Sequence, residues 1–137
     1  MDVQAVAAEI ATKLDTITGL RAFGYPPGQA PFPCGVVVLP DDVTYDETYG
    51  RGSDAMTFPV FVFVSRNDDR TAALELMPYL DGSGSKSVKT AVDSTNTNAY
   101  SECDTVTVQR AETGAYTYNG VDCYGAEFTV YVTGSGS

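Results

Sequence analysis

The stretch that decides the fold is Tyr116-Thr117-Tyr118-Asn119-Gly120-Val121-Asp122-Cys123-Tyr124. Asn-Gly between β-forming residues is typical of a two-residue type I′ turn, so this stretch predicts a β-hairpin. The returning strand alternates in polarity, and one of its faces is apolar throughout. The residues of that face are Ala126, Phe128, Val130 and Val132.

The strand that enters this hairpin has a register problem. If Tyr118 pairs with Val121, strict alternation places Val108 opposite Tyr131, on the wrong face of the sheet. One extra residue on either strand would bring Val106 and Val108 beside the apolar face of the returning strand. The sequence therefore predicts a β-bulge near Gly114 or Gly125.

Apolar residues at three- and four-residue steps predict three helices. The first spans residues 3–17, with Asp2 as its N-cap and Gly19 as its left-handed end. A second spans residues 70–80 and is kinked or shortened by Pro78. Ser85 is expected to cap a short third helix. The apolar face of the second helix is expected to comprise Ala73, Leu76, Met77 and Leu80.

Further strands are predicted between the first two helices. Short strands are expected at residues 20–25 and 36–39, separated by a proline-rich loop at 26–33. Residues 43–49 and 56–65 form a second hairpin whose tip lies at 50–53. Its return strand is apolar on both faces from Val60 to Val64, which is typical of a strand covered on both sides. We expect helices on one side and a neighbouring subunit on the other.

These elements define the expected fold class and domain boundaries. The fold is α+β: an antiparallel-rich sheet of four to five strands, with the N-terminal helix and the two middle helices packed on it. Residues 1–132 form a single domain, and residues 133–137 form a flexible Gly/Ser tail.

Composition argues against several classes of partner. The chain has 137 residues and a net charge of −10, because 18 acidic residues outnumber 8 basic ones. Nucleic-acid and anionic-membrane surfaces need clustered Lys and Arg, so neither partner is expected. Three widely spaced cysteines are not a disulfide framework, which predicts reduced thiols in a cytoplasm. No targeting segment is seen, and the longest apolar run is too short to span a bilayer.

Catalytic and cofactor motifs are not evident. The absence of histidine excludes Ser-His and Cys-His nucleophile pairs and most zinc sites. The Gly82-Ser83-Gly84-Ser85-Lys86-Ser87 stretch lacks both glycines of a phosphate-binding loop at the required positions. The twelve residues that begin at Asp81 also lack the glycine and the glutamate of a calcium loop, because Lys86 and Val92 stand at those positions. We therefore predict no enzyme activity, no cofactor and no metal.

The tyrosines and their neighbours on the two hairpins are the best candidates for contact with other proteins. Tyrosine combines a large apolar area with a polar tip and is enriched at interfaces. The predicted interface residues are Tyr45, Asp46, Glu47, Tyr49, Arg51, Phe61, Phe63, Tyr116 and Tyr118.

Two segments carry a resemblance to a known family. Residues 81–92 read DGSGSKSVKTAV and residues 124–132 read YGAEFTVYV. With the order of elements along nearly the whole chain, they resemble the tail terminator proteins of long-tailed, siphovirus-type phages, especially those of actinobacteria. The resemblance implies a ring, expected to be a hexamer, that caps the tail tube, ends its polymerisation and joins the tail to the head connector. It implies a structural protein of the virion neck, assembled in the host cytoplasm.

The partners that follow from this resemblance are further copies of the chain, the major tail tube protein and the head–tail connector or stopper protein. DNA would pass through the ring without sequence-specific binding. Two alternatives stay open. One is a head–tail stopper or another neck protein. The other is a monomeric binding module whose tyrosines line a sugar or protein site.

Overall fold

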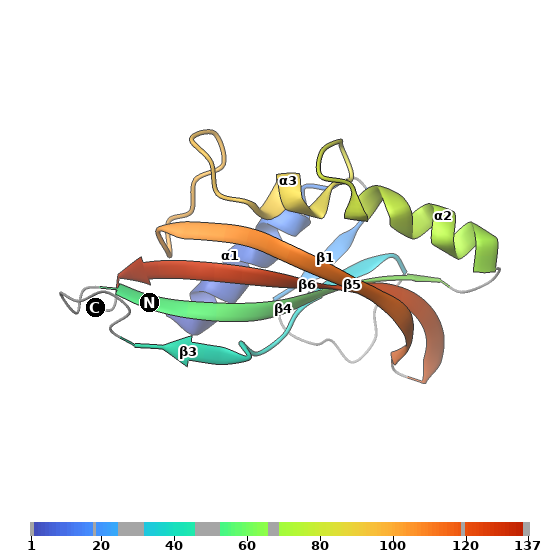
Figure 1. The fold of residues 1–137 in the computed structure, drawn as a ribbon, viewed down its shortest axis with the longest axis horizontal. Helices are drawn as coiled ribbons and strands as arrows, with labels where there is room; N and C mark the ends of the chain where they lie inside the picture. Colours follow the sequence, from blue (N-terminus) through green and yellow to red (C-terminus); the bar gives the residue numbers. More distant parts are fainter. Residues whose placement is uncertain are drawn as a thin grey trace.

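The computed structural model describes residues 2–17, 19–24, 32–45, 53–65, 69–118 and 120–135. Three helices and six strands form one layered unit (Figure 1). The elements in chain order are α1 Val3–Leu14, β1 Arg21–Phe23, β2 Cys34–Val37, β3 Asp42–Thr44, β4 Ser53–Ser65, α2 Asp69–Leu80, α3 Val88–Val92, β5 Thr105–Tyr118 and β6 Val121–Ser135.

All six strands belong to one sheet in the order β1-β2-β4-β6-β5, and β3 pairs with the first part of β4. Every pairing is antiparallel except that between β1 and β2. The α+β class and the antiparallel-rich sheet are thus confirmed, with six strands in place of the four to five predicted. The short β1 and β3 account for the difference, because three-residue strands leave little periodic signal.

The three helices pack on the same face of the sheet. Their buried side chains join those of alternate residues in β4 and β6 in a single core. In β4 that face carries Met56, Phe58, Val60, Val62 and Val64, all of them buried. The prediction that helices cover one face of this strand is therefore confirmed.

The β5–β6 hairpin has the predicted pairing and a differently placed bulge. Tyr118 pairs with Val121, and Val106 and Val108 lie opposite Val132 and Val130 as expected. The register shift lies at Gln109, between Val108 and Arg110, and not at a glycine. The predicted position near Gly114 or Gly125 is wrong, because those two glycines pair directly with each other.

The helix ends follow the sequence in part. The Asp2 carboxylate accepts a hydrogen bond from the Ala5 N–H at 3.2 Å, so the predicted N-cap is confirmed. Helix α1 ends at Leu14, earlier than predicted, and tighter hydrogen-bonded turns follow at Thr16 and Ile17. Gly19 has φ +86°, in the left-handed region. The cap of α3 is Ser87 and not Ser85: its hydroxyl accepts from the Thr90 N–H at 3.2 Å.

The buried face of α2 is rotated from the predicted one. Ala72, Leu76 and Tyr79 point into the core, whereas Met77 is 54% exposed. Ala73 and Leu80 are half-buried at the margin. Burying the large Tyr79 ring moves the contact to this side of the helix. Pro78 lies inside the last turn, and α2 nevertheless extends to Leu80.

The C-terminal strand extends into the segment expected to be flexible. Thr133 and Gly134 of β6 pair with Ala55 and Asp54 of β4, and Gly134 is buried. Residues 133–135 are therefore part of the sheet, while 136–137 lie outside the described residues. In the described part of the chain, none of the helices is both long and apolar enough to span a membrane.

The loop before β5 is fastened to α1 by a carboxylate. Glu9 accepts hydrogen bonds from the Ser101 and Glu102 N–H groups, each at 2.9 Å, and from the Ser101 hydroxyl at 3.1 Å. Lys13 donates to the Ala99 carbonyl at 3.1 Å. Partial burial raises the pKa of Glu9, but these hydrogen bonds outweigh it and leave that pKa below its usual value.

Candidate functional site

The second face of the sheet is the candidate site, and we call it the open face. Within the described ranges no helix packs on it. Its residues on the central strands point away from the helical core and alternate with the core residues. On β4 they are Thr57, Pro59, Phe61 and Phe63, and on β6 they are Cys123, Gly125, Glu127, Thr129 and Tyr131.

Three aromatic rings from β4 and β5 form an aromatic cluster on the open face. Phe61 and Phe63 stack with ring centroids 5.6 Å apart and an interplanar angle of 9°. Tyr116 meets both edge-on, at 5.8 Å from Phe61 and 5.6 Å from Phe63. These are the favoured geometries for aromatic pairs, and each pair adds about 0.5–1.5 kcal/mol beyond its buried area.

A glycine makes room for the aromatic cluster. Gly125 of β6 lies between Phe63 of β4 and Gly114 of β5 in the same cross-strand row. A Cβ at Gly125 would stand 2.7 Å from Phe63 Cδ1 and 3.1 Å from Tyr116 Cδ2. The two rings therefore cover the bare backbone of Gly125, in the manner by which aromatic side chains stabilise strand glycines.

The aromatic cluster is buried on one side and open on the other. Phe63 is only 5% exposed and packs with Cys34, Val36 and Cys123 in a small second core. Phe61 and Tyr116 are half-buried. The chain thus covers part of this side of β4 itself, and the surface that remains for a partner centres on Phe61 and Tyr116.

Carboxylates border the cluster. Glu112 of β5 and Glu127 of β6 lie directly opposite each other on the open face, and Arg110 forms an ion pair with Glu112. Burial first, and then the charges of Glu127 and Glu112, raise the pKa of Tyr116 above its usual value. The surface is therefore aromatic with an acidic rim, and the Tyr116 hydroxyl stays protonated near neutral pH.

The structure brings together three of the predicted interface residues, Phe61, Phe63 and Tyr116. Tyr45 lies apart from them, just after β3, and is 71% exposed. Tyr118 ends β5 opposite Val121. Asp46, Glu47, Tyr49 and Arg51 lie outside the described residues, as does the predicted hairpin tip.

Sequence reasoning missed several exposed apolar side chains. Leu39 is 83% exposed, and Leu74 of α2 is 59% exposed. Leu39 continues the apolar run of β2 and looks like a core residue in the sequence. Its position between Val38 and Pro40 was the available signal, because a proline ends the strand that would have buried it.

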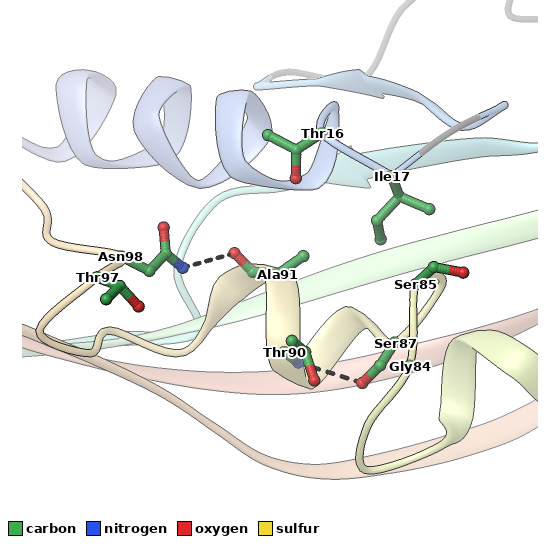
Figure 2. A pocket seen from close by; sticks show the side chains of 9 residues that line it. All are labelled: Thr16, Ile17, Gly84, Ser85, Ser87, Thr90, Ala91, Thr97 and Asn98. Atoms are coloured by element: carbon green, nitrogen blue, oxygen red, sulfur yellow. Dashed lines mark hydrogen bonds between the residues drawn. The ribbon is translucent and has the colours of Figure 1, made fainter.

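A hydroxyl-lined hollow of about 320 Å³ lies between the segment after α1, the turn at residues 84–87 and α3 (Figure 2). Several of its polar groups bond within the chain. The Ser87 hydroxyl donates to the Asp81 carbonyl at 2.6 Å, and the Asn98 amide donates to the Ala91 carbonyl at 2.9 Å. These bonds give the hollow a structural role in joining α3 to its flanking loops.

The described residues hold no group of three or more Cys, Asp or Glu side chains arranged to bind a metal ion. The three cysteines are buried, and none of them forms a disulfide. Burial raises the pKa of Cys34 to about 11 and that of Cys103 to about 12, which keeps both thiols protonated.

The fold and the site together define an α+β domain with an aromatic, acid-rimmed sheet face. No protein family model and no curated protein sequence matches this chain.

Proposed function

We propose that this chain is a structural subunit of a long phage tail, a tail terminator. Copies of it form a ring, a hexamer in our expectation, at the end of the tail tube. The ring stops polymerisation of the tube and joins the tail to the head connector. In this role the chain has no enzymatic activity and belongs to the neck region of the virion.

The observation that carries the proposal is the half-buried state of Phe61 and Tyr116 on the open face of the sheet. Helices cover one face of the sheet, and the other face carries the aromatic cluster. Such a face is suited to contact with other proteins, because aromatic residues are enriched at the centres of interfaces. The tail tube is the partner that the resemblance of residues 81–92 and 124–132 implies.

The charge of the chain also supports the proposal. A net charge of −10 on each copy would give a ring a strongly negative surface. Such a surface repels the phosphate backbone, so DNA would pass through the ring without sticking to it.

The test is a deletion of the gene from a phage genome that encodes this chain, followed by complementation. We expect overlong tails that do not join heads, measured by negative-stain electron microscopy. Wild-type protein should restore normal tails, and so should an Asn96→Glu control, since Asn96 lies exposed in a loop on the helical side. Phe61→Glu should fail to restore them while keeping a cooperative thermal unfolding transition.

Three outcomes would contradict the proposal in different ways. Tails of normal length joined to heads after the deletion would refute it. Cryo-electron microscopy density for the chain next to the portal, away from the tube end, would identify a head–tail stopper. Full complementation by Phe61→Glu would remove the aromatic cluster from the interface.

A further inference from the structure

An apolar groove runs between α2 and the second half of β5, and we call it the α2–β5 groove. Helix α2 packs over β4 and β6, and α3 packs over the beginning of β5. Residues 109–115 of β5 are all exposed. Two hollows of about 170 and 200 Å³ follow this seam. They are bordered by Leu80 and Ala73 from α2 and by Ala111 and Ala115 from β5.

Met77 lines neither hollow, but helical spacing places it beside the α2 wall of the groove. It lies one turn after Ala73 and three residues before Leu80, so the three side chains share one side of the helix. Met77 is 54% exposed. A long, flexible thioether side chain beside an open groove adapts readily to the shape of a docked partner.

The outer edge of β5 is protected along its first half only. The Val106 N–H donates to Ser94 Oγ at 3.0 Å, and the Val106 carbonyl accepts from the Ser94 N–H at 2.8 Å. The Val108 N–H donates to Asp93 Oδ1 at 2.7 Å, and its carbonyl accepts from Lys89 Nζ at 3.2 Å.

This protection stops at the bulge at Gln109. Among the described residues, no comparable hydrogen bonds reach the outer edge of β5 at 110–115. An unprotected strand edge is a template for pairing with another chain. The open half of β5 borders the α2–β5 groove, so backbone pairing and apolar contact are available in one place.

The opposite edge of the sheet carries an apolar projection, which we call the Leu39 edge. It comprises the extended segment after β2 and the start of β3. Leu39 is 83% exposed there and borders an apolar hollow of about 300 Å³ together with Val38 and Pro40. The strand order β1-β2-β4-β6-β5 places β2 and β5 on different sides of the central strands. One copy can therefore present a different surface to each of two neighbours.

Charges differ between the two edges. Asp41 and Asp42 follow Leu39 and Pro40 directly, and both are exposed. Apart from residues in ion pairs, two basic residues lie near the α2–β5 groove: Lys86, whose ammonium stands over the Tyr79 ring, and Arg70, which shares the Ala73–Met77 side of α2. Lys89 and Arg110 also line the groove, but Asp93 and Glu112 balance their charges, and Asp81 is a further acidic residue of the lining.

We propose that the Leu39 edge of one copy docks into the α2–β5 groove of the next copy, so that copies join head to tail. Leu39 then meets the Ala73–Met77–Leu80 side of α2, and Asp41 and Asp42 approach Arg70 and Lys86. A head-to-tail contact of two different surfaces closes into a ring when its rotation allows it. The inference rests on the proposed function for its ring and adds the two surfaces that build it.

The test uses two variants that each remove one surface, Leu39→Asp and Met77→Asp. Both side chains are exposed, so each variant should keep a cooperative thermal unfolding transition. Native mass spectrometry at increasing concentration should show rings for the wild type and monomers for either variant alone. An equimolar mixture should give a one-to-one dimer and nothing larger, because each variant retains the surface that the other has lost.

Leu74→Asp is the matched control. Leu74 is exposed on the same helix but is one residue from Ala73 and six from Leu80, so it does not share their side of the helix, and this variant should assemble like the wild type. A wild-type chain that stays monomeric throughout, a mixture that forms no dimer, or equal loss of assembly in Leu74→Asp would overturn the inference. Rings that do not cap tail tubes would count against the proposed function alone. Normal capping by Leu39→Asp would count against this docking alone.

Discussion

Replacement of Gly125 by alanine should destabilise the protein, although alanine is normally favoured over glycine. The added Cβ would stand 2.7 Å from Phe63 Cδ1 and 2.9 Å from the Val62 carbonyl oxygen. Rotation of the Phe63 side chain can relieve the first contact. The second is to backbone of the neighbouring strand, so β4 and β6 must separate locally to relieve it.

The size of the effect follows from two opposing contributions. Overpacking a well-packed site costs about 1–3 kcal/mol. Alanine recovers about 0.5–1 kcal/mol, because glycine loses more backbone entropy on folding. The φ of Gly125 lies outside the left-handed region, so the alanine adds no backbone strain to the overpacking cost. We expect a net loss of about 1–2 kcal/mol in the free energy of unfolding, or roughly 5 °C in Tm for a chain of this size.

Gly114→Ala is the matched control, since Gly114 pairs directly with Gly125 on the neighbouring strand. A Cβ at Gly114 would meet only Tyr116 Cε2, at 3.9 Å, which is an ordinary contact. This variant should be neutral or slightly more stable than the wild type. Urea unfolding followed by tyrosine fluorescence measures both. Equal stability of Gly125→Ala and the wild type, or equal loss in the two variants, would refute this account of the aromatic cluster.

Three further predictions concern the helical side and the thiols. Glu9→Gln should cost about 1 kcal/mol at neutral pH, because charge-assisted bonds to the loop before β5 are lost. The pKa of Glu9 is lower in the folded protein than in the unfolded chain. The stability that Glu9 contributes is therefore present above the unfolded pKa and is lost as pH falls through the folded pKa. Below about pH 5, the free energy of unfolding of Glu9→Gln should consequently depend less on pH than that of the wild type. Ser87→Ala should lower stability by about 1–2 kcal/mol by urea unfolding, with Ser85→Ala unchanged. Cys34 and Cys103 should react with a thiol reagent slowly in the native protein and rapidly in urea, and fast native labelling would contradict their burial.

The β5–β6 hairpin shows which parts of the fold the sequence could predict. The Asn119-Gly120 turn and the alternation of apolar residues are local signals, and they gave the correct partners for Val106 and Val108. The alternation on the two strands is offset by one residue, so the hairpin must contain one extra residue, but the alternation does not show where that residue lies. Glycines are common at bulges, yet here Gly125 serves ring packing across strands. That packing depends on β4, which is distant in sequence.

Helix α2 illustrates the opposite case. Apolar residues occur on several sides of this helix, and periodicity alone favoured the side with Ala73, Met77 and Leu80. The sheet instead buries Ala72 and Tyr79. Which side faces the core depends on the direction in which the chain enters from β4, and a single sequence does not contain that information. The aromatic cluster was more predictable, because Phe61 and Phe63 alternate with core residues along one strand and therefore point to the other face.

The two halves of β5 differ in how their outer backbone groups are satisfied. Asp93, Ser94 and Lys89 satisfy the outer backbone groups of Val106 and Val108, which prevents strand pairing there. The same strand continues past Gln109 without such protection in the described residues, beside an apolar groove. An edge of this kind invites uncontrolled aggregation unless a specific partner covers it. The net charge of −10 opposes random association between free copies. The proposed contact between the Leu39 edge and the α2–β5 groove would have to overcome that repulsion chiefly through the apolar surface that it buries.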